Sequence, residues 1–238
     1  MGPGNQADMS LRADRAIGDA QVIVGYETYL QLIEDKLTGK KVIGIGIVQE
    51  IDRCQAAIEE AMAGKHVAIV SGGDPGIYGM AGLVLELVNK YPEVVQPEVV
   101  IVPGISAIGA AAAVLGAPLM HDFAVVSWND LLTPWEVIEK RIEMAAAGDF
   151  VVALYNPKQS RRLFQLEKVR EIMLRYRAGT TPVGIVYHET RFNENRKLIE
   201  LEDFTQEHVV DVFSLVVIGN SQTYVESGRM ITPRGYVL

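Results

Sequence analysis

One stretch, Val67–Gly79, limits the choice of fold more than any other part of the chain. It reads Val-Ala-Ile-Val-Ser-Gly-Gly-Asp-Pro-Gly-Ile-Tyr-Gly, so consecutive apolar residues pass into small and polar ones before a segment with helical periodicity begins. Consecutive rather than alternating apolar residues are typical of a strand that is covered on both faces. The stretch therefore predicts a buried strand, a glycine turn and a helix, the unit from which α/β sheets are built.

The same alternation recurs along the 238 residues. Apolar runs predict strands at Gln21–Val24, Val42–Val48, Val67–Ser71, Glu98–Val102, Ala124–Ser127, Phe150–Tyr155, Pro182–Tyr187 and Val212–Gly219. Spacings of three and four predict helices at Asp8–Asp19, Glu27–Asp35, Ile51–Ala63, Tyr78–Lys90, Ser106–Leu115, Pro134–Ala147 and Arg161–Tyr176. Thr133 before Pro134 predicts a capped helix start with proline at the first helical position.

The best internal break is Leu115–Leu119, where glycine and proline separate glycine-rich loops from longer charged helices. We therefore expect an α/β protein of two α/β domains, residues 1–117 and 118–238, with a cleft between them.

Composition narrows the class of protein. Apolar residues make up 49% of the chain, enough for a packed core, yet no apolar run approaches the about 20 residues that cross a bilayer. We expect a soluble, cytoplasmic protein without a membrane partner. The net charge of −8 and the short basic patches argue against a nucleic-acid partner. The single cysteine, Cys54, falls in a helical apolar series and is interpreted as a core residue.

Small and polar residues follow the predicted strands, where open α/β sheets bind ligands. Gly72 and Gly73 would let a ligand approach the backbone, and Asp74 could accept hydrogen bonds from hydroxyl or ammonium groups. The alternative is a tight strand-to-helix turn with Asp74 as helix cap. Ser106 follows the next predicted strand and could cap a helix or contact a ligand.

Several common sites are not indicated. Gly44-Ile-Gly46 lacks the third glycine of the dinucleotide fingerprint, and there is no phosphate-binding Walker loop. His121-Asp122 and His188-Glu189 are adjacent pairs rather than helical pairs, so no metal site is expected. No Gly-x-Ser-x-Gly elbow points to a nucleophile.

Taken together, the loops resemble those of the tetrapyrrole methylases. The resemblance is carried by Gly2-Pro-Gly4, Ala20–Tyr26, Ser71–Gly76 and Val102–Ala107. Within that family, further stretches look like the branch that methylates precorrin-3B at C17 in cobalamin biosynthesis: His121–Phe123 with Asp130–Trp135, Ala153–Lys158 and Ile231–Tyr236. The family's first strand should precede Gly2, so the resemblance implies that this strand is missing here.

The resemblance implies S-adenosylmethionine as cofactor, methyl transfer to a tetrapyrrole carbon coupled to ring contraction, and a homodimer. The cofactor would contact Pro3, Gly72, Gly73, Asp74, Ile77, Ser106, Ala107, Asn156 and Gly184. Candidates for the substrate are Gly2, Gly4, Lys158, Arg161 and Arg162. Because ring contraction involves proton transfers, His121, Asp122 or Asp130 is the candidate catalytic residue.

Three alternatives stay open at this point. The chain could methylate another carbon of a tetrapyrrole, it could be a nucleotide-dependent oxidoreductase, or it could be a non-catalytic binding relative. The missing fingerprint disfavours the oxidoreductase. The sequence does not say whether the substrate carries cobalt.

Overall fold

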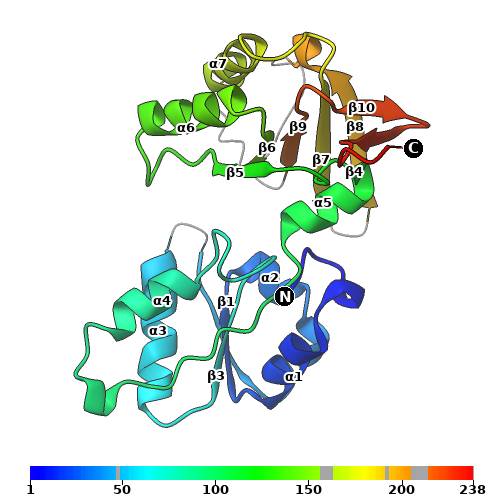
Figure 1. The fold of residues 1–238 in the computed structure, drawn as a ribbon. Helices are drawn as coiled ribbons and strands as arrows, with labels where there is room; N and C mark the ends of the chain where they lie inside the picture. The colour runs from blue at the N-terminus through cyan, green and yellow to red at the C-terminus, as the bar shows by residue number, and fades with distance from the viewer. Residues whose placement is uncertain (47–48, 156–162, 191–192, 205–213, 238) are drawn as a thin grey trace. The chain divides into compact units, whose positions relative to one another are not determined.

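The computed structural model describes residues 1–46, 49–155, 163–190, 193–204 and 214–237 (Figure 1). The chain divides into two compact units, Met1–Ala107 and Ile108–Leu238. The sequence places the break ten residues later, at residue 117. Helix α5 (Ala107–Leu115) accounts for the difference, because its Leu115 packs against Gly184 of the second unit.

The first unit is a parallel sheet with helices on both faces. Its strands are β1 (Val22–Gly25), β2 (Lys41–Gly44) and β3 (Val67–Val70), in the order β2-β1-β3. Its helices are α1 (Leu11–Asp19), α2 (Glu27–Gln31), α3 (Glu50–Met62) and α4 (Ala81–Val88), with 3-10 turns η1 (Gln6–Asp8), η2 (Glu34–Lys36) and η3 (Glu93–Val95).

Alternate residues of the sheet face two different cores. Ile23 and Val70 pack with Ile17 of α1, and Ile69 packs on the opposite side with Cys54 of α3. Cys54 is fully buried, which confirms its interpretation as a core residue.

The second unit is built on a five-stranded sheet of order β5-β6-β9-β7-β8. These strands are β5 (Phe123–Ser127), β6 (Val151–Tyr155), β7 (Pro182–Thr190), β8 (Asn193–Glu200) and β9 (Leu215–Ile218). A smaller sheet joins β4 (Gly116–Ala117), β10 (Tyr224–Glu226) and β11 (Arg229–Ile231), and η4 (Leu201–Asp203) follows β8.

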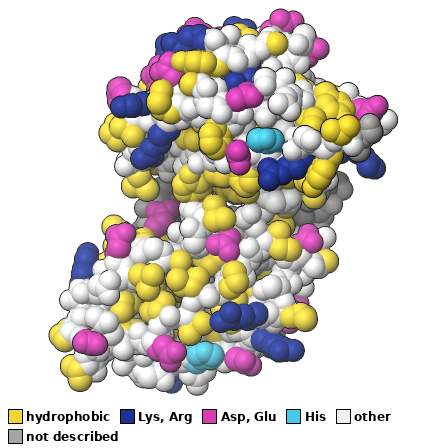
Figure 2. All heavy atoms as spheres, in the orientation of Figure 1, with side chains coloured by type: hydrophobic (Ala, Val, Ile, Leu, Met, Phe, Trp, Pro, Cys, Tyr) yellow, Lys and Arg dark blue, Asp and Glu magenta, His cyan; other side chains and the backbone are white. Residues whose placement is uncertain are grey.

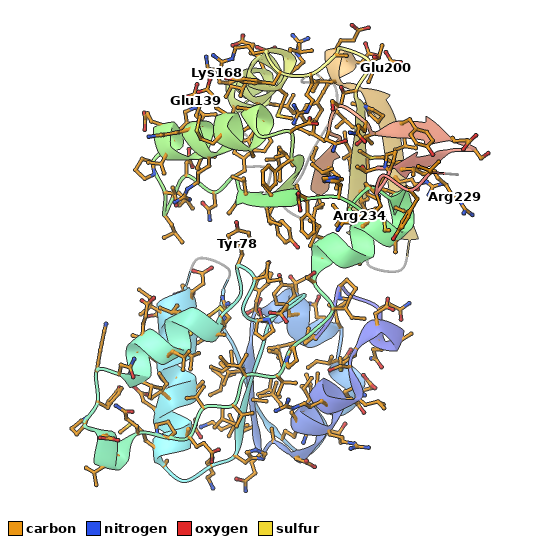
Figure 3. The ribbon with its side chains drawn as sticks, in the orientation of Figure 1. Tyr78, Glu139, Lys168, Glu200, Arg229 and Arg234 are labelled. Carbon is orange, nitrogen blue, oxygen red and sulfur yellow. The ribbon has the colours of Figure 1, made fainter. Side chains whose placement is uncertain are left out.

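Helices α6 (Trp135–Ala147) and α7 (Leu163–Leu174) pack against the five-stranded sheet, and Ile138 and Ile142 of α6 are fully buried in that core. On the outer side, Lys168 of α7 lies 3.6 Å from Glu139 of α6 (Figure 3). The apolar stripe of each helix thus faces the sheet and the charged stripe faces solvent.

Most predicted elements are confirmed, with three corrections. Glu98–Val102 is assigned to no strand. The helix expected from Tyr78 begins only at Ala81, because Pro75–Met80 forms turns and bends. Pro134 is itself the N-cap of α6, with extended ψ of 140°, rather than its first helical residue. Strand β8, rich in polar residues, was not predicted. No helix among the described residues is long and apolar enough to cross a membrane.

Candidate functional site

The loop after β3 is tied to the start of the chain. Gly73 and Gly2 form an antiparallel bridge, in which the Gly2 N–H donates to the Gly73 carbonyl at 3.2 Å and the Gly73 N–H donates to the Gly2 carbonyl at 2.7 Å. Both glycines have left-handed backbone, with φ of 77° at Gly2 and 66° at Gly73. The sequence-predicted loop Gly2–Gly4 therefore lies directly beside the sequence-predicted loop Ser71–Gly76.

A third loop joins these two at Gly104. A Cβ on Gly104 would lie 2.3 Å from the Gly73 carbonyl oxygen and 3.4 Å from the Gly2 nitrogen. Backbone atoms cannot move aside as a flexible side chain can, so only glycine fits at this position. Three chain segments, at residues 2, 73 and 104, are thus in direct backbone contact at one edge of the first unit.

Asp74 holds the same loops together through its carboxylate. Its Oδ1 accepts from the Gly76 N–H at 2.8 Å and its Oδ2 accepts from the Gly104 N–H at 2.9 Å. Asp74 does not cap α4, whose N-cap residue is Met80, so the helix-cap alternative is wrong. A carboxylate has about four lone-pair sites, so these two bonds leave Asp74 able to accept from a ligand as well.

In the loop after β3, the part that faces solvent is apolar. Ile77 is 41% exposed and Tyr78 is 54% exposed, and Tyr78 has an unusual positive φ of 54°. In Figure 3 the Tyr78 side chain projects from the tip of this loop, away from the sheet of its own unit. Behind the loop, the Tyr29 ring lies so close to Gly72 that a Cβ there would come within 2.9 Å of it. The loop therefore presents half-exposed backbone at Gly72 with an apolar rim.

The start of α5 follows the Gly104 loop. Ser106 and Ala107 are half-buried, and Ala107 is the first helical residue. In the second unit, the Ile108 N–H donates to the Tyr155 hydroxyl at 2.7 Å, so the side chain at the end of β6 satisfies an N–H of the first helical turn. Sequence reasoning missed Tyr155, although it directly precedes the predicted site residue Asn156.

In the second unit, a polar pair lies beyond the carboxyl end of β5. Asp130 Oδ2 accepts from the Gln165 side-chain amide at 3.0 Å, and Gln165 is 3% exposed. The buried Trp128 and the half-buried Trp135 stack with ring centroids 6.3 Å apart. The Trp128 indole N–H is buried and has no hydrogen-bond partner in the described structure. Gln165 was missed, since a lone glutamine on a helix carries no motif.

His121 and Asp122 lie at the opposite end of the same strand. They precede Phe123, the first residue of β5, whereas Asp130 follows its last residue, Ser127. Five residues of strand extend about 16 Å, so the three candidates do not converge on one site. His121 Nδ1 accepts from the Asp122 backbone N–H at 2.8 Å and lies 3.6 Å from the Asp122 carboxylate, so the two side chains are held together at a turn.

The remaining predicted residues divide into two groups. Gly184 lies within β7, and a Cβ there would come within 2.6 Å of the Leu115 side chain, so the contact that the structure shows is with α5. Asn156, Lys158, Arg161 and Arg162 lie outside the described residues.

Comparison with known proteins places the chain among methyltransferases. Residues 1–205 match the profile of the tetrapyrrole (corrin/porphyrin) methylases. A probable cobalt-factor III C(17)-methyltransferase of Salmonella typhimurium strain LT2 is 50% identical over 238 residues, which cover all of this chain and 98% of that protein. A precorrin-3B C(17)-methyltransferase of a Sinorhizobium species is 36% identical over 99% of this chain and 94% of that protein.

Two solved structures of methyltransferases have the same fold as this chain. The methyltransferase CobJ superposes with a TM-score of 0.91 at 35% identity, over 98% of this chain and 96% of that one. A uroporphyrin-III C-methyltransferase from Thermus thermophilus, solved with S-adenosyl homocysteine, has a TM-score of 0.64 at 20% identity over 92% of this chain and 94% of that one, which shows the shared fold.

Proposed function

Because the chain belongs to the tetrapyrrole (corrin/porphyrin) methylases, we propose that it transfers a methyl group from S-adenosylmethionine to C17 of a corrin precursor, with ring contraction, in cobalamin biosynthesis. The observation that carries the proposal is similarity over the full length of both chains to relatives named for methylation at that carbon. The macrocycle is the partner of the chain in this reaction.

The cobalt-bearing form is the preferred substrate in this proposal. The relative named for cobalt-factor III is 50% identical, whereas the relative named for precorrin-3B is 36% identical. The metal would be held by the macrocycle and would enter and leave with the substrate.

The loops of the first unit suit a sulfonium nucleoside. The Asp74 carboxylate can accept from hydroxyl or ammonium groups, Gly72 leaves its backbone half-exposed, and Ile77 offers an apolar contact. When bound, S-adenosylmethionine supplies an electrophilic methyl group on a sulfur that is already a good leaving group. The chain then has to orient the two reactants and exclude water. The proposed cofactor contacts also include Pro3, Ser106, Ala107, Asn156 and Gly184.

Asp130 is the candidate for proton transfer during ring contraction. It lies beyond the carboxyl end of a parallel strand, where α/β sheets bind ligands, and Gln165 orients its carboxylate. We propose Asp130 ahead of His121 and Asp122, the other two candidates, because those two lie at the other end of that strand. The proposed contacts to the substrate are still Gly2, Gly4, Lys158, Arg161 and Arg162.

The proposal is tested by turnover under anaerobic conditions. The protein is incubated with S-adenosylmethionine carrying a ¹³C-methyl group and with either cobalt-factor III or precorrin-3B. Mass spectrometry reports one added methyl group, and carbon NMR locates it and detects the contracted ring. We expect product from cobalt-factor III at C17. Methylation at another carbon, or no product while the cofactor binds, would refute the assignment.

The role of Asp130 is tested with a matched control. Asp130→Asn is expected to lower the yield of ring-contracted product about 100-fold or more while binding of S-adenosyl homocysteine is unchanged. His121→Ala should retain full turnover. Equal loss in both variants would contradict the assigned role. We also propose that the enzyme is a cytoplasmic homodimer, which sedimentation equilibrium and cell fractionation would test.

A further inference from the structure

Arg53 is a buried cation near the start of α3. It is 4% exposed, and it forms no ion pair with any carboxylate that the structure describes. Figure 2 shows lysine and arginine side chains on the surface of the first unit, where water solvates their charges. Taking a charge out of water without an acidic partner is costly, and an apolar residue at this inward position would avoid that cost. The contacts of the guanidinium are therefore what arginine adds here.

The start of α3 lies at the carboxyl edge of the first sheet. Helix α3 follows β2, and the helix after each strand of a parallel sheet begins at the edge where ligands bind. In Figure 1 α3 and α4 lie side by side, and their buried residues share one core on one face of the sheet. In Figure 3 Tyr78 projects from the same end of the unit. Arg53 is therefore placed among the loops that follow the strands.

One guanidinium contacts the loops after all three strands. Its Nη2 donates to the carbonyl of Gly46, after β2, at 2.5 Å, and its Nη1 donates to the Sδ of Met80, in the loop after β3, at 3.8 Å. Its Cζ lies 6.0 Å from the ring centroid of Tyr26, directly after β1, which is the distance of a cation–π contact. The planar fork of arginine presents donors in several directions at once, whereas lysine presents a compact point charge.

The contact with Tyr26 continues to the glycine turn of the cofactor loop. The rings of Tyr26 and Tyr29 meet edge-to-face, with centroids 5.5 Å apart and planes at 82°, an arrangement that aromatic pairs favour. The Tyr29 ring lies behind Gly72, where a Cβ would come within 2.9 Å of it. Arg53 is therefore connected to Gly72 through two tyrosine rings and to Met80 directly.

The loop Gly72–Met80 is thus held at both of its ends. The glycine bridge and the Asp74 carboxylate hold its first half, and Arg53 holds Met80 at its end. Between them Tyr78 is 54% exposed and has a φ of 54°. Such a conformation is uncommon for a residue other than glycine and persists only where the surrounding structure maintains it.

We propose that Arg53 positions the second half of the cofactor loop by tying Met80 and the turn at Tyr26 to α3. The inference rests on the proposed function, in which this loop binds S-adenosylmethionine. Arg53 acts through the loop and is a positioning residue. Without the guanidinium the loop can move while the sheet and its helices stay folded. Affinity for the cofactor should then fall further than the loss of stability explains.

Two substitutions separate the contacts of Arg53 from its volume. Arg53→Met keeps a long unbranched side chain but removes the donors and the charge, and Arg53→Lys keeps the charge without the planar fork. Ile17→Ala is the matched control. Ile17 is buried on the other face of the sheet, where it packs with Ile23 and Val70, so its truncation destabilises the same unit without touching Arg53.

Three measurements are made on each variant. Hydrogen–deuterium exchange without ligand is followed at Gly76, Ile77 and Ala81, whose amides donate within the loop. Calorimetric titration with S-adenosyl homocysteine gives the affinity, and urea unfolding gives the stability. Arg53→Met should speed exchange and weaken binding by about tenfold or more each, and Arg53→Lys should fall between it and the parent. Ile17→Ala should unfold at lower urea concentration yet stay within about twofold of the parent in both other measurements.

Exchange at the parent's rate in Arg53→Met would overturn the proposal. An equal loss of affinity in Ile17→Ala would do the same, because the loss would then follow from stability alone. If Arg53→Met does not fold, as seen by circular dichroism, the same two comparisons are made with Arg53→Lys and decide in the same way. If the parent does not bind S-adenosyl homocysteine, the proposed function fails, while the exchange rates still decide whether Arg53 holds the loop.

Discussion

Replacing Gly104 with alanine tests whether the three-loop contact holds the cofactor loop in place. The new Cβ would lie 2.3 Å from the Gly73 carbonyl oxygen, about 1 Å closer than an ordinary contact, and 3.4 Å from the Gly2 nitrogen. The neighbouring atoms belong to the backbone, so a loop has to shift by about that distance. The shift would strain the two hydrogen bonds between Gly2 and Gly73 and the bond from the Gly104 N–H to Asp74.

The expected cost follows from these contacts. Overpacking costs about 1–3 kcal/mol, and each weakened neutral hydrogen bond adds at most about 1 kcal/mol. We therefore expect Gly104→Ala to destabilise the first unit by about 2–4 kcal/mol. A displaced loop should also bind S-adenosyl homocysteine more weakly, and because about 1.4 kcal/mol corresponds to tenfold in affinity, we expect a loss of about tenfold or more.

Calorimetric titration with S-adenosyl homocysteine and urea unfolding measure the two effects separately. Gly82→Ala is the matched control, because Gly82 lies in α4 and a Cβ there meets nothing within 4 Å. Alanine should stabilise that helix by up to about 1 kcal/mol and leave binding unchanged. The reasoning fails if Gly104→Ala binds within twofold of the parent and unfolds at the same urea concentration.

Three further predictions concern stability. Burial raises the pKa of the Cys54 thiol to about 11. Between pH 9 and 11 only the thiol of the unfolded chain ionises, so the free energy of unfolding should fall across that window. In urea unfolding at several pH values, Cys54→Ala should lack this part of the pH dependence. Ser10 caps α1, so Ser10→Ala should cost about 1 kcal/mol by thermal unfolding, and no loss would rule out the cap. Asp149→Asn keeps the side-chain shape at a residue with φ of 58° but removes the negative charge that lies 3.0 Å from the buried Arg177. The free energy of unfolding should fall by about 1–3 kcal/mol, and an unchanged midpoint of urea unfolding would contradict this.

The fold class and the loop positions could be predicted because both depend on local pattern. Consecutive apolar residues at Val67–Val70 and Val151–Tyr155 predict buried strands, and the small residues that follow each one predict turns. Strand β8 escaped prediction because its Asn-Glu-Asn-Arg-Lys segment lacks apolar alternation. It forms at the edge of the sheet, where pairing with β7 along seven positions supplies the hydrogen bonds that its composition does not predict.

The site could be predicted only in part, because its contacts join residues far apart in the chain. Motifs pointed to Gly73 and Asp74, but no local rule shows that Asp74 would bind the Gly104 N–H, thirty residues away. The choice among His121, Asp122 and Asp130 also depends on geometry that a motif does not carry. All three belong to the same motif-bearing stretch, yet strand β5 separates His121 and Asp122 from Asp130.

The glycine contacts bear directly on how such an enzyme can work. Methyl transfer from a sulfonium needs little acid or base assistance, so rate depends on how closely the two reactants are held in line. Loops that bind through backbone groups can move unless something fixes them. Here the bonds between Gly2 and Gly73, the close approach of Gly104 and the two bonds to Asp74 fix three loops at one edge of a sheet.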